Sequence, residues 1–383
     1  MSNISKIIGK NIKNLLSENN CSVLQLSKII GLSRPTIKKI IEGSTIIDSG
    51  KLLIISKYFN KPFEYFLEEE HDGLSFLFRA NNPKENCNNY DKNFIESKMK
   101  KVSEIYKLVD ENISFIPVQY NLNLKQHDIK SLNDNIEKTL ESIAIKEREY
   151  LSIGECVGTD LIKCFENKGI RIIFDDMDNN QIFGVSAFNE EDGCFIFIND
   201  NKSISEERKI FSIVHEYAHL LFNRSLYSNS TVCTQYSNYK TDINEKIANS
   251  FAGYFLITCD SLKKYDYFLK PPIPWKILFE IKNELKVSIQ SLIMALHKYK
   301  YINSTEKNTA FKKLYLSGYK LKEPEPMNYI QKNTKIYNMV KNLYIRDEIG
   351  INKTAELLGI KNIDARRITA KWVSDEEKLQ SFI

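Results

Sequence analysis

The feature that most constrains this chain is residues 211–222, a segment near its middle that carries two histidines four positions apart. Its apolar residues recur at helical spacing, which predicts one amphipathic helix. His215 and His219 then stack on one face of that helix, where both imidazoles can reach a single metal ion. Glu216 lies beside them. In this H-E-x-x-H pattern the histidines bind zinc and the glutamate acts as general base, so the segment indicates a metallopeptidase.

Paired histidines on such a helix can also be ordinary hydrogen-bonded core residues, so a third ligand decides between the two interpretations. Residues 244–256 predict a second amphipathic helix, on which Glu245, Ala248 and Asn249 share a face. A small residue one turn after Glu245 lets the two helices lie close enough for its carboxylate to join the imidazoles. We therefore expect a His₂Glu site with water as fourth ligand. Zn²⁺ is the expected ion, although Mn²⁺ and Fe²⁺ also suit these ligands.

Residues 1–70 predict short helices separated by tight turns. Residues 22–30 form a Ser-capped helix, Gly31 ends it, and Ser33 caps the next helix. This spacing is that of a helix-turn-helix, whose second helix enters the DNA major groove. Residues 1–67 hold ten basic and four acidic side chains, which favours DNA over the competing interpretation, a protein-interaction module. The side chains expected to contact DNA are Arg34, Thr36, Lys38 and Lys39.

The rest of the chain divides by pattern into three parts. Residues 71–135 predict a linker or helical connector, because periodicity is weak there. Residues 136–305 predict the domain that holds the metal helix, and residues 306–383 predict a helical C-terminal domain. Three β-branched or apolar runs indicate a small sheet before the metal helix; they are 170–174, 184–188 and 194–198. The expected fold class is α+β and mostly α, with an N-terminal five-helix unit.

The C-terminal part contains a further helix-turn-helix-like pattern at residues 351–359 and 364–369. Two interpretations remain open for it. It is either a second nucleic-acid contact through Arg366, Arg367 and Lys371 or a helical packing cap, and the sequence favours the cap slightly.

Composition bounds the setting of the protein. The chain has no apolar run long enough to span a membrane and no N-terminal charged segment leading into one, so we expect a cytoplasmic protein. Its seven cysteines are scattered without a C-x-x-C pair, which argues against both a disulfide framework and a cysteine zinc finger. We do not expect His127 or His297 to be metal ligands.

These motifs resemble two known families. Residues 1–70 resemble the XRE (Cro/repressor-like) DNA-binding family. The sequence His215-Glu-Tyr-Ala-His219, followed by Glu245-x-x-Ala-Asn-x-Phe-Ala, resembles the ImmA/IrrE metallopeptidase family over residues 136–260. Within this likeness Tyr217-Ala218 replaces the more usual Leu-Gly, and Asn223 stands where a histidine is common, but neither change touches a ligand.

The resemblance implies a zincin-like domain that cleaves XRE-type repressors and so relieves repression of stress or mobile-element genes. The expected partners are an operator in double-stranded DNA and a repressor-type substrate, and a homodimer is an open expectation. The alternative is a transcriptional regulator or antitoxin whose peptidase-like domain is a sensor without significant proteolysis. Self-cleavage between the modules is a third option. The chemistry also needs an oxyanion partner, for which the candidates are Tyr217, Tyr236, Tyr239 and Tyr254.

Overall fold

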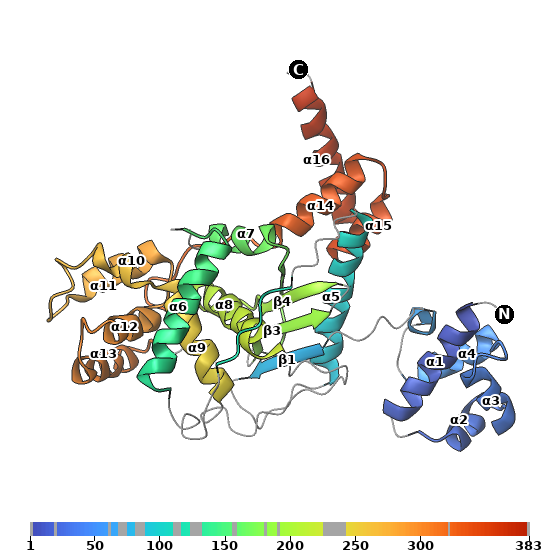
Figure 1. The fold of residues 1–383 in the computed structure, drawn as a ribbon. Coiled ribbons are helices and arrows are strands. Elements are labelled where there is room, and N and C mark those ends of the chain that lie inside the picture. The colour runs from blue at the N-terminus through green and yellow to red at the C-terminus, as the bar shows by residue number, and fades with distance from the viewer. Residues whose placement is uncertain are drawn as a thin grey trace. The chain divides into compact units, whose positions relative to one another are not determined.

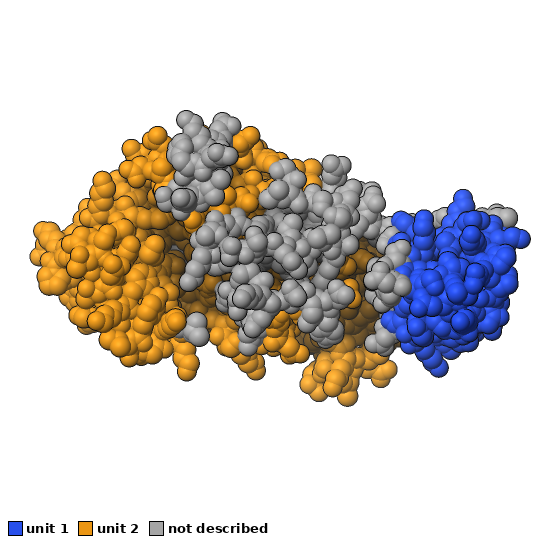
Figure 2. All heavy atoms as spheres, turned by 90° about the horizontal axis from the view of Figure 1, so that it is seen from below, with its two compact units in different colours: residues 1–73 blue, residues 74–383 orange. Residues whose placement is uncertain are grey.

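The chain divides into two compact units, residues 1–73 and 74–383, which Figure 2 colours separately. It is mostly helical with one small sheet, which confirms the predicted fold class. Among the described residues, none of the helices has the length and apolar character needed to cross a membrane. The structure is a computed structural model that describes residues 3–18, 21–59, 63–67, 75–80, 89–109, 116–122, 132–154, 159–179, 182–189, 192–224, 243–320 and 322–380.

The helices of the first unit enclose one apolar core, as predicted for the five-helix unit. Leu15, Leu26 and Ile55 from three of the helices are completely buried in it. Gly9 allows the first and third helices to approach closely, because a Cβ there would lie only 2.3 Å from the carbonyl oxygen of Ile40. The elements are α1 (Asn3–Glu18), α2 (Val23–Ile30), α3 (Arg34–Ile41), α4 (Ser49–Tyr58) and the 3-10 helix η1 (Phe63–Phe66).

The turn between α2 and α3 is fixed by local chemistry. Ser22 and Gln25 form a capping box at the start of α2. Gly31 ends α2 in the left-handed conformation, with φ 65° and ψ 35°, which glycine adopts without steric cost. The Ser33 side chain then accepts a hydrogen bond from the Thr36 backbone N–H at the start of α3. The three predicted boundaries are confirmed.

A four-stranded sheet lies in the second unit, with strand order β1-β3-β4-β2. β1 pairs antiparallel with β3, β3 antiparallel with β4, and β4 parallel with β2. Three strands match the predicted runs, whereas β1 comes from the segment expected to be a connector. The strands are β1 (Ser75–Ala80), β2 (Arg171–Asp175), β3 (Ile182–Asn189) and β4 (Gly193–Asn199).

Helices cover both faces of this sheet, which explains why β4 is buried along its whole length. Cys194, Ile196 and Ile198 pack into one core, whereas Phe195 and Phe197 pack into another. The first core is shared with α6 (Asp134–Tyr150), α7 (Thr159–Asn167), α8 (Glu206–Phe222) and α9 (Ile243–Leu256). The second is shared with α5 (Asn89–Leu108), α14 (Thr334–Ile345), α15 (Ile351–Leu358) and α16 (Asn362–Gln380). Figure 1 shows this arrangement.

The second unit has a third apolar core, which lies beside α9 and is formed by four further helices. Its central residues include Leu292 and Ile293, which are fully buried, and Leu314 extends it. Residues of the predicted C-terminal domain thus contribute to all three cores of the second unit: Leu314 to this one, Ile330 to the core of α6–α9, and α14–α16 to the other. The four helices are α10 (Cys259–Lys263), α11 (Trp275–Leu285), α12 (Ile289–Lys298) and α13 (Ser304–Leu316).

A buried lysine ties these helices to the start of α8. The Lys282 ammonium lies 3.1 Å from Glu207 of α8 and 3.1 Å from Glu323, and it donates to the carbonyl oxygen of Pro324 at 2.9 Å. Charges buried this deeply are tolerated because each one is paired. The Glu-Pro-Glu-Pro segment at 323–326 is therefore held against the helix that carries the two histidines.

Glu166 on α7 provides a test of this packing that is independent of any function. Burial raises the pKa of its carboxyl to about 7, against the lowering effect of Lys335 and Lys163. The folded state therefore binds this proton more tightly than the unfolded state does, so Glu166 destabilises the fold progressively from about pH 4.5 to 7 and constantly above that. We expect Glu166→Gln to be more stable than wild type at pH 8, by about 3 kcal/mol at most, and nearly equal to it at pH 4.5.

Urea unfolding at both pH values measures this difference. Glu149→Gln, at an exposed position on α6, is the matched control and should change stability little at either pH. A difference between Glu166→Gln and wild type that does not grow with pH would contradict the assignment.

Candidate functional site

The two histidines of the H-E-x-x-H segment lie on α8, which is buried over nearly its whole length. Ser205 caps its start by accepting a hydrogen bond from the Arg208 backbone N–H. His215 and His219 occupy one face, as predicted, and their Nε2 atoms are 3.1 Å apart. Their side chains are 0 % and 2 % exposed. The Nε2 atoms of both imidazoles thus point toward one position between them.

Glu245 reaches that position from α9, which packs beside α8 (Figure 1). Its carboxylate oxygens lie 3.3 Å from the Nε2 atom of His215 and 3.1 Å from that of His219. Ala248 and Ala252, both buried on α9, leave the two helices room to approach. Among the described residues, these three form the one cluster of histidine, cysteine and acidic side chains with the spacing of a metal site. The structure therefore brings together the trio that the sequence predicts.

The distances within the trio fit a tetrahedral zinc site. Zn²⁺ binds nitrogen and oxygen ligands at about 2.0–2.1 Å, so two ligand atoms of a tetrahedral site lie roughly 3.3 Å apart. The three separations here are 3.1, 3.1 and 3.3 Å. Two imidazoles and one carboxylate also match the donor set of catalytic zinc sites, which keep a fourth position open.

The electrostatics of the trio explain how its charges are tolerated in the interior. Burial favours the neutral form of His219. The hydrogen bond to Glu245 and the negative charge of that carboxylate outweigh burial and raise the pKa of His219 to about 9. Burial likewise opposes ionisation of Glu245, yet its hydrogen bonds to His215 and His219 hold the pKa of that carboxyl well below its usual range. In the chain alone, a shared proton therefore compensates the carboxylate. A metal cation would take over that role by displacing the proton.

Asn223, at the C-terminal end of α8, orients one of the imidazoles. Its side-chain oxygen lies 3.0 Å from Nδ1 of His219, and its amide nitrogen donates to Asn244 at 2.9 Å. The bond at Nδ1 fixes the ring so that Nε2 faces Glu245, which is the usual arrangement behind a metal-binding histidine. In the sequence Asn223 stands out only as a departure from the family pattern, because its partner on α9 becomes visible only in the fold.

Ser186 on β3 holds the predicted general base. Its hydroxyl donates to Oε2 of Glu216 at 2.8 Å, and both residues are completely buried. Gly184, on the same face of β3, leaves space for the glutamate, since a Cβ there would lie 3.0 Å from its Cγ atom. Sequence reasoning missed Ser186. The signal available was a small residue and a hydroxyl at alternate positions of an otherwise apolar strand.

Two of the four tyrosines considered as oxyanion partners lie in the described part of the chain, and their environments differ. Tyr217 points away from the trio, because its hydroxyl donates to Glu147 of α6 inside the apolar core. Tyr254 lines a cavity beside the trio, and the Lys298 ammonium lies 3.9 Å from the centre of its ring. Tyr236 and Tyr239 lie outside the described residues, as does His127. His297 bonds Ser304 at 3.1 Å.

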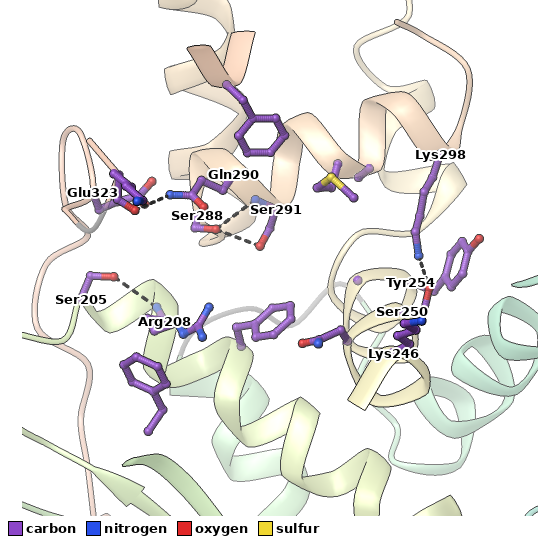
Figure 3. A pocket seen from close by; sticks show the side chains of 18 of the residues that line it. Ser205, Arg208, Lys246, Ser250, Tyr254, Ser288, Gln290, Ser291, Lys298 and Glu323 are labelled. Atoms are coloured by element: carbon purple, nitrogen blue, oxygen red, sulfur yellow. Dashed lines mark hydrogen bonds between the residues drawn. The ribbon is translucent and has the colours of Figure 1, made fainter. Parts of the chain in front are cut away.

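A cavity of about 1150 Å³ lies one helical turn from the trio along α8 and α9, and none of the three residues of the trio lines it. Phe211, one turn before His215, lines it, and the two rings are 6.3 Å apart. Asn249, one turn after Glu245, lines it as well. Figure 3 shows Arg208 of α8 facing the serines of α12 across the cavity, and Lys298 donating to Ser250 of α9. Among the described lining residues, five are basic and two are acidic.

The residues predicted to contact DNA all lie on α3. Arg34, Lys38 and Lys39 are exposed, whereas Ile37 on the opposite face is buried. Thr36 is only partly exposed, and its hydroxyl bonds that of Ser33 in the helix cap. Three of the four side chains are thus free to meet a ligand, and the fourth helps to shape the helix start.

Comparison with known proteins agrees with this two-part organisation. Residues 12–66 match the family described as helix-turn-helix, and residues 165–297 match peptidase family M78, described as the IrrE N-terminal-like domain. None of the curated proteins compared with the chain matches it. A solved structure, the apo form of the competence regulator ComR from Streptococcus vestibularis, is 14% identical and covers 84% of this chain and 94% of its own, with a TM-score of 0.16. At that score the likeness supports no conclusion.

The helix-turn-helix match spans α2 and α3, and the M78 match spans the sheet strands β2–β4 together with the trio on α8 and α9. The chain is therefore a fusion of an XRE-type helix-turn-helix segment with an ImmA/IrrE-like segment.

Proposed function

We propose that this protein is a DNA-binding regulatory zinc metalloendopeptidase that cleaves a repressor-type protein in a stress or mobile-element response. The observation that carries the proposal is the buried trio of His215, His219 and Glu245 with Glu216 beside it. Its fusion to a helix-turn-helix segment supports a regulatory role over general proteolysis. A cytoplasmic location follows from the DNA partner, and a homodimer would suit a two-fold symmetric operator.

In this proposal each residue of the site has one task. His215, His219 and Glu245 hold the ion. When bound, Zn²⁺ supplies Lewis-acid chemistry, since it lowers the pKa of water and polarises a peptide carbonyl. Glu216 accepts the proton of the attacking water and returns it to the leaving amine. Ser186 keeps the Glu216 carboxylate in place through the 2.8 Å hydrogen bond.

The cavity supports a polypeptide as substrate. It is large enough for several side chains, and two of its lining residues, Phe211 and Asn249, lie one helical turn from His215 and Glu245. The surplus of basic groups in its lining favours acidic side chains near the cleaved bond. Binding of the helix-turn-helix near an operator would also raise the local concentration of a repressor bound there.

The second candidate is a regulator or antitoxin whose peptidase-like domain senses or binds without cutting. Burial favours it, because His215, Glu216 and His219 expose at most 2 % of their surface, so a peptide bond reaches them only if the site opens. Two measurements distinguish the candidates. If the protein is a regulator without proteolysis, the Glu216→Gln variant binds the operator as well as wild type does, and wild type leaves every co-encoded XRE-type protein intact.

The metal assignment predicts a graded loss of zinc affinity. We expect one Zn²⁺ per chain in competition with a chromophoric chelator. Asn223→Ala should weaken binding by about 10- to 100-fold, because it releases the His219 ring. His219→Ala removes a ligand and should weaken binding further. His297→Ala is the matched control and should bind zinc as wild type does. Equal zinc affinity of wild type, Asn223→Ala and His219→Ala would refute the site.

The proposed reaction predicts that Glu216→Gln abolishes cleavage. The purified, zinc-loaded chain is mixed with candidate XRE-type repressors, and fragments are identified by mass spectrometry. We expect the rate to fall by about 10²- to 10⁴-fold in Glu216→Gln while zinc binding is retained, since the residue moves a proton and does not hold the ion. The exposed Glu149→Gln serves as control. Cleavage that continues at the wild-type rate in Glu216→Gln would rule out the mechanism.

Ser186 is predicted to be a positioning residue. Ser186→Ala removes a hydrogen bond to a charged carboxylate, so we expect kcat to fall by about 10- to 100-fold with little change in KM. Ser212→Ala is the control, because Ser212 is equally buried on α8 but does not bond Glu216. An equal effect of both substitutions on kcat would show that Ser186 acts through packing alone.

A further inference from the structure

The last three helices of the chain lie beyond both family matches and form a second helix-turn-helix. α15 has eight residues and ends at Gly359, which is left-handed with φ 66° and ψ 31°. α16 begins three residues later, at Asn362. The family matches end at residue 297, so neither assigns a role to this segment.

This turn repeats the N-terminal one at a constant distance of 328 residues. α2 also has eight residues and ends at a left-handed glycine, Gly31, with φ 65° and ψ 35°, and α3 also begins three residues after it. The residue that follows each glycine is apolar and half-buried, Leu32 in one turn and Ile360 in the other. Two segments of one chain thus have the same helix length, the same glycine conformation and the same spacing.

The repeat extends to the face expected to meet DNA. At the 328-residue shift, Lys38 and Lys39 of α3 correspond to Arg366 and Arg367 of α16. All four side chains are exposed. The residue before each pair, Ile37 in α3 and Ala365 in α16, is buried and packs the helix against its neighbours. The basic pair therefore occupies the same outward position in both helices.

The basic side chains of α16 are available for a ligand. Arg366, Arg367 and Lys371 are exposed, and none of them forms an ion pair with any residue in the described part of the chain. The opposite face packs against the other helices of the segment. Trp372 is buried there and donates through Nε1 to the Tyr337 hydroxyl of α14 at 2.7 Å.

The other helices of the segment hold α16 in place without covering its basic face. On α15, Lys353 lies 2.6 Å from Glu104 of α5, and Lys101 of α5 donates to the carbonyl oxygen of Glu356 at 3.3 Å. α14 packs on α5 as well. Figure 1 shows α16 extending away from the sheet. A packing cap needs only the buried face and leaves the exposed arginine pair unexplained.

We propose that α14–α16 is a second DNA-binding unit, in which the first turns of α16 enter the major groove of duplex DNA. On a duplex of mixed sequence, Arg366, Arg367 and Lys371 would contact the phosphate backbone. This reverses the preference for a packing cap that the sequence gives. The proposal does not depend on metal binding or proteolysis.

The test measures binding of the full chain to a fluorescent 30-base-pair duplex of mixed sequence at 50 mM salt by anisotropy. The contribution of the first unit is reduced by Lys38→Gln/Lys39→Gln. In that background we expect duplex binding to persist, and Arg366→Gln/Arg367→Gln to weaken it by at least about 10-fold. The slope of log affinity against log salt should also fall by about two, one for each lost phosphate contact.

Two controls separate DNA contact from general effects. Lys312→Gln/Lys313→Gln removes the same charge from exposed positions of α13 and should leave affinity nearly unchanged. Arg366→Lys/Arg367→Lys keeps the charge and should retain most of the binding. The proposal is overturned if the Lys38→Gln/Lys39→Gln chain does not bind the duplex, if Arg366→Gln/Arg367→Gln equals the α13 control, or if single-stranded RNA is bound more tightly than the duplex.

Discussion

The buried carboxylate of Glu245 between two imidazoles is the interaction on which the second unit depends. A carboxylate in this interior is stable only when a positive charge compensates it, whether a proton shared with His219 or a metal cation. The need for close approach explains the small side chains of Ala248 and Ala252 on α9. The same ion pair joins α8 to α9, so the candidate chemistry and the packing of the domain rest on one contact.

Hydrogen bonds and an ion pair join α8 to α11, β3 and α6, and these contacts fix the orientation of its functional side chains. Glu207 at its start pairs with the buried Lys282 of α11. Glu216 accepts a hydrogen bond from the sheet, and its neighbour Tyr217 donates to α6. His215, Glu216 and His219 therefore face the site, whereas Tyr217 faces the core. A site built in this way is preorganised, which is what proton transfer at a fixed position requires.

Features set by local sequence could be predicted, whereas features set by distant pairing could not. The spacing of His215 and His219, and the small residues after Glu245, indicate the trio because helical period alone places them. Ser186 and Asn223 were missed because their roles depend on which strand and helix lie opposite. β1 escaped prediction for the same reason, since its pairing with β3 spans about a hundred residues. The sequence pattern of the C-terminal helices is compatible with both a packing cap and a DNA-binding unit. The exposure of the arginines, which only the structure shows, favours the DNA-binding unit.

The central claim is that the trio is a metal centre with nitrogen and oxygen ligands, and zinc K-edge X-ray absorption on the zinc-loaded chain tests it most directly. The account predicts nitrogen and oxygen neighbours at about 2.0–2.1 Å, with imidazole scattering from two histidines and no sulfur neighbour. A sulfur neighbour at about 2.3 Å, or a spectrum that is unchanged in His215→Ala/His219→Ala, would contradict it.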